Sequence, residues 1–437
     1  MTKLAQLEGL QVLKYIRFRK DPLTFLYETY TLGDIIAINP KGKNISYIVH
    51  SPEAVKEILT TKEGSFIKGA SAKTFSKTLG NSVLTSEGEE HQRQRKLVQP
   101  AFHKKKIASY ADVVTQYTKE LTDSWQQGET RPIHTDMMNL TLRIIAKTLF
   151  GVDRKEESSS IAQAVNHIIE KTASTLLSPF PIVDKLPTEK NRKGTEAVSI
   201  LHELADQLIE EASKQEDDHM LKMLTKSTYD DGTPLSRQEI RDQVVTFLLA
   251  GHETTANALT WVWILLSKHP QVAKLLQQEL HEVLGGRTPT FEDVPQLIYT
   301  NQVVQETLRL YPPAWIILRE ATKDVEIAGV PFKKGSTFLI SPYAVHRNPH
   351  FFTEPHDFIP DRFSIERKAD IPNYAYFPFG AGSRGCMGSQ FAMMEAVLVI
   401  ATVAQSATLQ LQEESIATEP LVSLRAGGAV NMMITKM

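Results

Sequence analysis

The sequence predicts a mainly helical protein with a minor β region. Helix-start signals recur from 51 to 309, and the clearest is the capping-box pattern Ser236-Arg237-Gln238-Glu239. Stretches with strand composition are confined to three regions, near 34–49, 314–341 and 407–437. No linker or internal repeat divides the 437 residues, so we expect a single domain over 1–437.

The elements follow from local composition along the chain. β-branched runs at 34–38 and 45–49 predict two strands, joined by the turn residues 39–44. Helices are expected to begin near Ser51 and Ser86, and the helix over 236–268 should extend roughly 50 Å. After Pro312 short strands return with Gly and Pro between them, and one more helix is expected over 389–405. The tail, 407–437, again has strand composition.

The amino-acid composition limits which binding partners and which cellular compartment we expect. Lys plus Arg (49) nearly balances Asp plus Glu (51), so nucleic acid is not an expected partner. A single cysteine excludes an intrachain disulfide and suits a reducing compartment, so we expect a soluble, cytoplasmic protein. The first twenty residues lack the apolar core of a signal peptide. The most apolar span, 244–266, carries His252, Glu253 and Asn257, which favours a buried central helix over a membrane anchor.

The only cysteine lies in the loop Phe379-Gly380-Ala381-Gly382-Ser383-Arg384-Gly385-Cys386-Met387-Gly388. A lone cysteine is most often a buried small hydrophobic residue, but such a cysteine does not require four neighbouring glycines. The loop also matches G-x-G-x-x-G, the dinucleotide fingerprint. That motif should follow a strand early in a βαβ unit and precede a carboxylate about twenty residues later, and neither holds here. A thiolate ligand to haem iron fits best, because the following helix and the loop N–H groups favour thiolate over thiol.

A second motif lies inside the long helix, at Ala250-Gly251-His252-Glu253-Thr254-Thr255. Gly and Thr weaken a helix, and a threonine hydroxyl can bond back to the carbonyl one turn earlier. Local opening beside Gly251 would leave room for a diatomic ligand over a haem. Glu253 and Thr254 would then supply a carboxylate and a hydroxyl for moving protons. The alternative is that Thr254 only packs and Glu253 is solvated.

A third pattern combines Glu306 and Arg309, three residues apart on one helix, with Arg362. An Arg–Glu–Arg cluster of this kind can be buried and can hold the cysteine loop in place. We therefore assign these three residues a structural role.

Together, these segments resemble the cytochrome P-450 family of haem-thiolate monooxygenases, over nearly the whole chain from about Asp21. The resemblance implies a triangular, mainly helical fold with a long central helix and haem b (iron protoporphyrin IX). It implies that Cys386 is the iron ligand and that Glu253 and Thr254 are the acid–alcohol pair of oxygen activation. The other residues implied to contact the haem are His91, Arg95, Ala250, Gly251, Arg319, Phe379, Arg384 and Gly388. At His91 the family often has tryptophan, so this sequence departs from the family pattern there.

The activity implied by the resemblance is insertion of one oxygen atom from O2 into a hydrophobic molecule such as a fatty acid, a terpenoid or a steroid-like compound. Electrons are expected from a separate ferredoxin or flavodoxin with its reductase. The basic cluster of Arg93, Arg95, Lys96, Lys104, Lys105 and Lys106 is a candidate docking surface, and a solvated charge run is the alternative.

By the same resemblance, apolar side chains should line a substrate pocket, closed by the tip around 426–430. These side chains are Phe66, Phe75, Leu79, Leu84, Phe247, Trp315, Ile316 and Ile317. Two other functions remain open from the sequence: a peroxide-driven haem-thiolate peroxygenase, which needs no proton relay, and a non-catalytic haem-binding sensor, in which the relay pair has no purpose.

Overall fold

The computed structural model describes residues 2–38, 45–153, 158–176, 186–214 and 219–437. The chain forms two units, each assembled from two separate stretches: Met1–Ser71 with Gln305–Cys386, and Ala72–Val304 with Met387–Met437. We call these the first and the second unit. Helices make up 59% of the residues that the structure describes, which confirms the predicted fold class, whereas the expected single domain stays a prediction.

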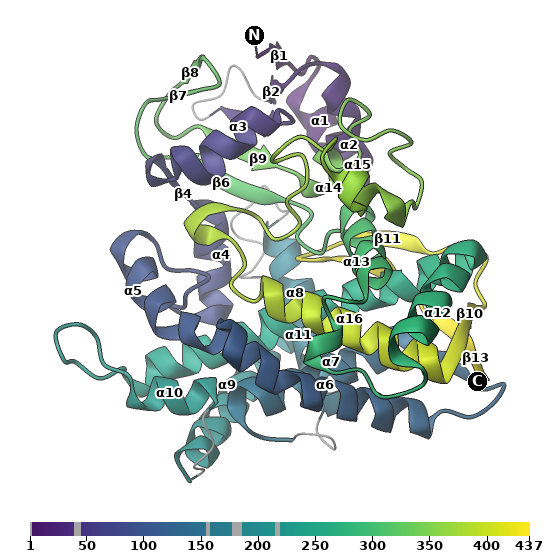
Figure 1. Ribbon diagram of the computed structural model, residues 1–437. Helices are drawn as coiled ribbons and strands as arrows, with labels where there is room; N and C mark the ends of the chain where they lie inside the picture. The colour runs from purple at the N-terminus through teal and green to yellow at the C-terminus, as the bar shows by residue number, and fades with distance from the viewer. Residues whose placement is uncertain (1, 39–44, 154–157, 177–185, 215–218) are drawn as a thin grey trace. The chain divides into compact units, whose positions relative to one another are not determined.

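The first unit is built on a six-stranded sheet in the order β1-β2-β3-β9-β6-β4 (Figure 1). The pairs β1–β2 and β3–β9 are parallel and the other neighbours are antiparallel. The strands are β1 (Leu4–Gln6), β2 (Ile35–Ala37), β3 (Ser46–Val49), β4 (Phe66–Ile67), β6 (Ile317–Ala321) and β9 (Thr337–Ile340). A hairpin of β7 (Val325–Ile327) and β8 (Val330–Phe332) turns at Ala328 and Gly329, whose φ angles are both positive (49° and 80°).

Helices of this unit are α1 (Gln11–Lys20), α2 (Pro22–Glu28), α3 (Pro52–Lys56), α14 (Pro342–Val345) and α15 (Ile365–Lys368).

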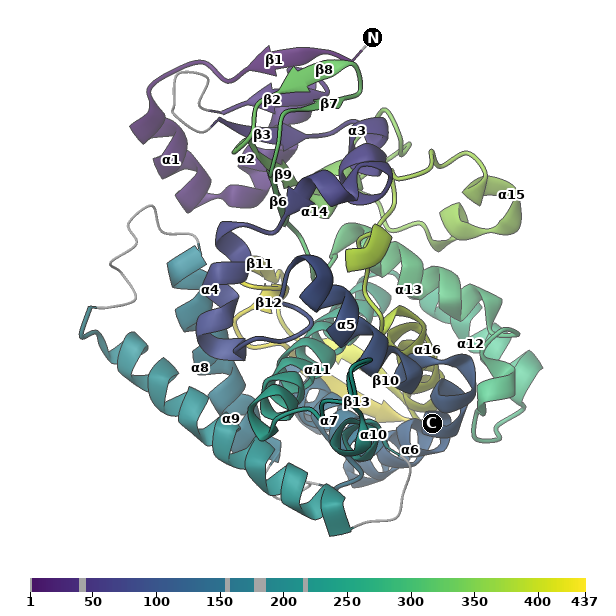
Figure 2. The same cartoon turned by 90° about the vertical axis from the view of Figure 1, so that its left-hand side faces the viewer.

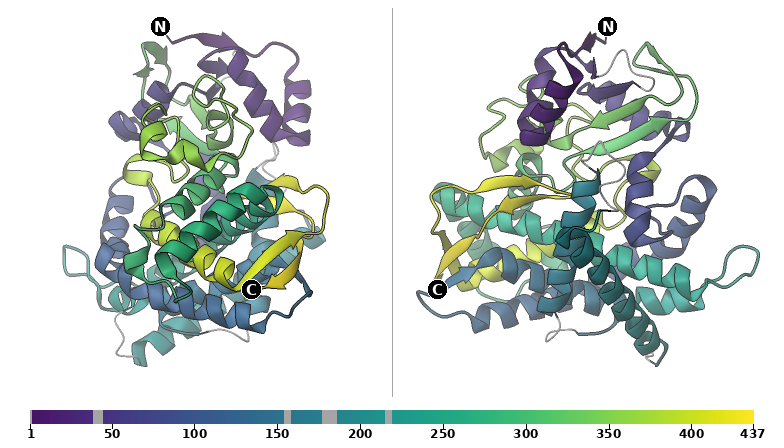
Figure 3. Two further views of the ribbon diagram at one scale, coloured as in Figure 1. Left: turned by 45° about the vertical axis from the view of Figure 1, so that its right-hand side comes forward. Right: turned by 180° about the vertical axis from the view of Figure 1, so that it is seen from behind.

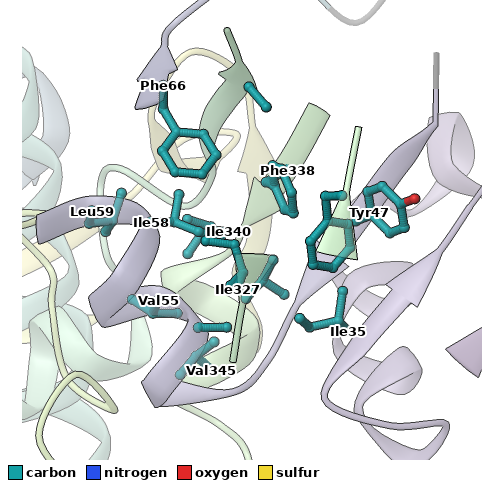
Figure 4. Packing of buried hydrophobic residues seen from close by; sticks show 14 of the residues in the cluster. Ile35, Tyr47, Val55, Ile58, Leu59, Phe66, Ile327, Phe338, Ile340 and Val345 are labelled. Atoms are coloured by element: carbon teal, nitrogen blue, oxygen red, sulfur yellow. The ribbon is translucent and has the colours of Figure 1, made fainter. Parts of the chain in front are cut away.

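The core of the first unit is an aromatic and aliphatic cluster centred on the sheet (Figure 4). Phe338 is fully buried at its centre, stacked on Tyr47 at 5.5 Å and edge-on to Phe66 at 5.6 Å between ring centroids. Ile58 and Leu59 join it from the helical segment that follows α3. This packing anchors the backbone of Leu59, which matters for the cysteine loop below.

The second unit is mainly helical, with α11 in contact with α7, α9, α10 and α16 (Figure 2). Its helices are α5 (Gly88–Val98), α6 (Lys104–Ser124), α7 (Ile133–Phe150), α8 (Ser158–Leu176), α9 (Glu189–Lys214), α10 (Met220–Lys226), α11 (Arg237–Lys268), α12 (Pro270–Leu284) and α16 (Ser389–Ser406). Two helices span the boundary between the units, α4 (Ala70–Leu79) and α13 (Ile298–Leu310). The sheet β10-β13-β5 carries the C-terminus (Figure 3), and a separate hairpin joins β11 to β12. These strands are β5 (Thr130–Pro132), β10 (Ala407–Leu411), β11 (Ala417–Pro420), β12 (Leu424–Gly427) and β13 (Asn431–Lys436).

The long helix α11 begins as the sequence predicts. The Ser236 hydroxyl accepts from the N–H of Glu239, and the Glu239 carboxylate accepts from the N–H of Ser236, which completes the capping box. The helix continues for 32 residues without interruption, about 48 Å at the standard rise. Most of its residues are buried against neighbouring helices.

The strand regions predicted near 34–49, 314–341 and 407–437 are confirmed by β2, β3, β6 to β9 and β10 to β13. The helix expected to begin near Ser86 begins at Gly88, with Glu87 at the N-cap. Ser86 is buried and donates to the Gln94 side chain (3.1 Å), so its hydroxyl is used in packing α5 rather than in capping it. The predicted turn at 39–44 lies outside the described residues.

Among the helices that the structure describes, α16 is long and apolar enough to cross a membrane, with 18 residues and a mean hydropathy of 1.2. Sixty-seven per cent of that stretch is buried, and the helix packs against α6, α11 and α12. Such a helix is typical of a protein core as well. The expected absence of a membrane anchor stays a prediction.

Candidate functional site

In the first unit, the loop around Cys386 is closed by its own backbone. The N–H of Cys386 donates to the Phe379 carbonyl (2.9 Å), and the N–H of Gly385 donates to that of Gly382 (3.0 Å). Gly380 and Gly382 have φ angles of +67° and +69°, a region that favours glycine. The loop therefore has one well-defined course, and it leaves the Cys386 side chain exposed.

Gly382 is required for a second reason, which is close packing. A Cβ atom at this position would lie 1.9 Å from the carbonyl oxygen of Leu59. Beside it, the N–H of Ser383 donates to the Glu63 carboxylate (2.8 Å). The cysteine loop is thus held directly against the segment that follows α3.

Two cationic side chains predicted to hold a haem are in the same unit as Cys386. Arg319, on β6, is buried and donates to the carbonyl of Leu318 (2.9 Å). Arg384, within the loop, is half-buried, as is Phe379. The side chain of Ile317, also on β6, lies 3.8 Å from the position that a Cβ of Gly380 would take. Strand β6 and the cysteine loop are therefore neighbours.

Glu306, Arg309 and Arg362 form one buried cluster in the first unit. Arg309 pairs with Glu306 (2.7 Å), both side chains being fully buried, and Arg362 donates to the other Glu306 oxygen (3.2 Å). Arg309 also donates to the carbonyl of His346 (2.8 Å), and the ring of His346 accepts from the N–H of Phe377 (2.9 Å). The Glu306 carboxylate is shared by the two guanidinium groups, and its charge and hydrogen bonds offset the free-energy cost of removing them from water. The cluster reaches the backbone two residues before the cysteine loop.

In the second unit, the middle of α11 is accessible although its flanks are buried. Ala250 is exposed, and Gly251 and Thr254 are half-buried. The Thr254 hydroxyl donates to the carbonyl of Ala250 (2.9 Å), the backward bond that the sequence predicts. This stretch presents small side chains and one hydroxyl.

The expected opening of the helix beside Gly251 is wrong, because α11 is continuous there. The glycine instead permits close packing of two helices. A Cβ at position 251 would lie 2.9 Å from Cδ1 of Ile145 on α7. The adjacent His252 is fully buried, and burial lowers the pKa of its imidazole to about 4, so the ring is neutral at physiological pH.

Glu253 is buried rather than solvated, with only 5% of the residue exposed. Its Oε1 accepts from the Ser423 hydroxyl (2.5 Å) and, at 3.4 Å, from the Asn257 amide. Burial raises the pKa of the Glu253 carboxyl, and the hydrogen bond from Ser423, the charge of Arg425 and the amide of Asn257 oppose that rise. Ser423 and Asn257 were not among the predicted site residues. Asn257 lies four positions after Glu253, a helical spacing that could have indicated it, whereas no local signal indicates Ser423.

His91 and Arg95 lie one turn apart on α5, where His91 is buried and Arg95 half-buried. Their basic neighbours have partners in the segment that precedes α11. The guanidinium of Arg93 lies 4.2 Å from the ring centroid of Tyr229, and Lys96 pairs with Asp230 (2.7 Å). Lys104 and Lys105, at the start of α6, are exposed.

The eight predicted pocket residues are divided between the units. Phe66 belongs to the core cluster of the first unit, where Trp315 is also buried and Ile316 and Ile317 are half-buried. In the second unit Leu79 and Phe247 are buried, and Phe75 and Leu84 are half-buried. Phe247 packs against Phe102 at 5.6 Å between ring centroids. The pocket as a whole stays a prediction.

The first-unit residues fit a haem bound through thiolate. Haem iron takes four ligands from its porphyrin and needs one axial ligand from the protein, and the exposed Cys386 can be that ligand. Among the described residues, only Ile317 and Gly385 have an atom within 4 Å of a Cβ built at Gly380, apart from its chain neighbours, so the loop is open at this point. Arg319 and Arg384 supply positive charge in the same unit, as anionic propionates require.

The chain matches the cytochrome P-450 family over residues 13–426. It is 36% identical to cyclooctatin synthase of Streptomyces melanosporofaciens, with 93% of this chain and 90% of that protein covered. It is 38% identical to cyclooctat-9-en-7-ol 5-monooxygenase of the same organism (88% and 84% covered). It is 32% identical to pentalenene oxygenase of Streptomyces avermitilis (87% and 85% covered). The glycine-framed cysteine, the long helix and these matches agree: the chain belongs to the cytochrome P-450 family and is a monooxygenase of that family.

Proposed function

We propose that this monooxygenase inserts one oxygen atom from O2 into a terpenoid, at a haem b whose iron is bound by the Cys386 thiolate. The observation that carries the proposal is the exposed cysteine in a loop with left-handed glycines. Terpenoid is favoured over fatty acid or steroid-like molecule because the substrates named for the relatives are terpenoids. A single cysteine in the chain suits the reducing cytoplasm.

When bound, the haem supplies the reductive activation of O2, and the chain positions the reactants and supplies protons. In the first unit, Cys386 would hold the iron, and Arg319 and Arg384 would supply positive charge to the propionates. In the second unit, Arg95 and the hydrogen-bond donor His91 are the proposed propionate contacts. The small side chain of Ala250, which is exposed, leaves space beside α11. Glu253 and Thr254 move protons, the carboxyl as the acid and the hydroxyl as the relay.

The first test is the absorption spectrum of the purified protein, reduced and exposed to carbon monoxide. Thiolate ligation predicts a strongly red-shifted Soret band, and Cys386→Ser should abolish it because serine supplies no thiolate. Titration with cyclic terpenoids, fatty acids and sterols then reports which class displaces water from the iron. Absence of haem despite adequate supply would contradict the proposal.

The second test concerns Thr254. Thr254→Ala should keep haem and substrate binding but lower coupled product formation by roughly tenfold to a hundredfold, because one proton-transfer group is lost. Reducing equivalents should appear as hydrogen peroxide instead. Unchanged coupling would contradict the relay role, and full activity with peroxide alone would favour the peroxygenase alternative.

A further inference from the structure

We propose that Ser423 and Asn257 are positioning residues that determine which oxygen of Glu253 carries the transferable proton. Ser423 lies in the connection between β11 and β12, and Asn257 lies one turn after Glu253 on α11. The inference rests on the proposed function, in which Glu253 is the acid of the proton relay. The hairpin of β11 and β12 would thus help to position the proton on Glu253, a role that neither the sequence nor the comparisons indicate.

The three side chains form a directed hydrogen-bond chain. The Asn257 amide nitrogen donates to the Ser423 hydroxyl oxygen (2.9 Å), and that hydroxyl donates to Oε1 of Glu253 (2.5 Å). The exposed fractions of Asn257, Ser423 and Glu253 are 0%, 3% and 5%. Because an amide nitrogen can only donate, the Ser423 hydrogen is directed at Glu253.

Both hydrogen bonds from these residues end on Oε1 of Glu253. In a protonated carboxyl group, the oxygen that accepts hydrogen bonds is the carbonyl oxygen, and the proton is on the other one. The chain therefore leaves the proton on Oε2. When Glu253 gives up this proton, the same donors stabilise the carboxylate. They are already in position, so no side chain has to reorient.

Within the described part of the chain, no charged group pairs with Glu253. Arg425, on β12, is the cation whose charge lowers the pKa of Glu253, but its own bonds go to Glu419 on β11 (2.7 Å) and to Asn166 on α8 (2.6 Å). Glu170 on α8 lies 4.0 Å from Arg425. On α7, burial lowers the pKa of His134 to about 4, so this ring is uncharged at neutral pH. Ser423 and Asn257 are thus the direct partners of Glu253 among the described side chains.

The test is infrared difference spectroscopy of the haem-loaded enzyme, with the carboxyl band of Glu253 assigned by its loss in Glu253→Gln. Ser423→Ala should shift this band to higher frequency, because the carbonyl oxygen loses the shorter of its two hydrogen bonds. It should also raise the titration midpoint of the band by about one pH unit, the equivalent of one hydrogen bond to a charged group. Coupled turnover should fall by roughly tenfold with the KM for substrate unchanged.

Ser423→Thr keeps the hydroxyl and should restore the band, the midpoint and the turnover. Thr402→Val on α16 is the matched control, since it removes a buried hydroxyl that donates to the carbonyl of Leu398 (2.7 Å), its one hydrogen bond among the described residues. It should change none of the three. The ferrous–CO spectrum reports folding of every variant. If Ser423→Ala does not fold, Asn257→Ala, which removes the donor behind Ser423, should shift the band in the same direction.

Two failures are distinguishable. If Glu253→Gln lowers coupled turnover but the Ser423 and Asn257 variants leave band and midpoint unchanged, the positioning role is overturned and the proposed function stands. If Glu253→Gln leaves coupled turnover unchanged, the relay assignment itself is wrong, and the positioning role is overturned with it.

Discussion

At the scale of single residues, Glu395 on α16 is an ionisable group whose environment opposes its charge. The residue is fully buried, and within the described part of the chain neither carboxyl oxygen has a partner at hydrogen-bonding geometry. Burial raises the pKa of Glu395 well above its usual range. Thr255 opposes this rise, although its hydroxyl donates to the carbonyl of Gly251 (3.3 Å). Burial therefore favours the protonated form of this carboxyl in the folded protein.

This has a consequence for stability against pH. The folded-state pKa of Glu395 lies above the unfolded value of about 4.3, so above that pH the unfolded state ionises while the folded state keeps its proton. Glu395 thus makes stability fall as pH rises, by up to about 1.4 kcal/mol per pH unit until the folded-state pKa is reached. Glu395→Gln cannot ionise, so its urea midpoint should decline less than that of the native protein between about pH 5 and pH 8. Parallel declines would show that the native carboxyl is already ionised.

At the scale of elements, the cysteine loop depends on two glycines for different reasons. Both have positive φ angles, but a Cβ at Gly382 would overlap the Leu59 carbonyl oxygen at 1.9 Å, whereas one at Gly380 would meet its nearest neighbour at 3.8 Å. The left-handed conformation alone costs an alanine about 1–2 kcal/mol. An overlap with packed backbone adds a further cost of about 1–3 kcal/mol.

We therefore expect Gly380→Ala to lower the free energy of unfolding by about 1–2 kcal/mol and Gly382→Ala by about 2–5 kcal/mol. The red-shifted Soret band of the ferrous–CO protein should also be weaker in Gly382→Ala than in Gly380→Ala. The reason is that the loop carrying Cys386 has to move to relieve the overlap. Denaturant titration measures the free energy of unfolding, and the ferrous–CO spectrum measures the intensity of the Soret band. Equal effects of the two substitutions would show that Leu59 yields without displacing the loop.

At the scale of the whole molecule, the net charge of −2 is too small to attract a redox partner by itself. The predicted docking surface is therefore the local basic cluster. Of the predicted cluster, Arg93 stacks on Tyr229 and Lys96 pairs with Asp230, while Lys104 and Lys105 are exposed at the start of α6. The last two are the lysines most available to an acidic partner.

Reversing both charges, in Lys104→Glu with Lys105→Glu, should slow reduction by an acidic ferredoxin on the order of tenfold at low salt. The difference should shrink at high salt, because the Debye length falls from about 10 Å at 0.1 M to about 3 Å at 1 M. Stopped-flow reduction measures the rate. Lys333→Glu with Lys334→Glu, between β8 and β9, makes the same change in net charge at exposed positions and should have little effect. If both double variants slow reduction equally, the redox partner does not dock at Lys104 and Lys105.

Much of the fold could be predicted because its signals are local. The capping box at Ser236, the long apolar helix after it and the strand regions around 317–340 and 407–436 depend on residues a few positions apart, and the structure confirms them. The strands β1, β4 and β5 were not predicted. Each has two or three residues and exists only through pairing with a distant strand, as Phe66 does with Ala321.

The sequence by itself indicated the family, which the comparisons confirm. It also predicted the cysteine that binds iron and the acid–alcohol pair on one helix, because each is a motif of adjacent residues. Only the tertiary structure decided why Gly251 is a glycine and what surrounds Glu253. Ile145 approaches Gly251 from another helix, and Ser423 reaches Glu253 across 170 positions of the chain. Contacts of such separation leave no local pattern, since they arise when distant segments pack together and exclude water.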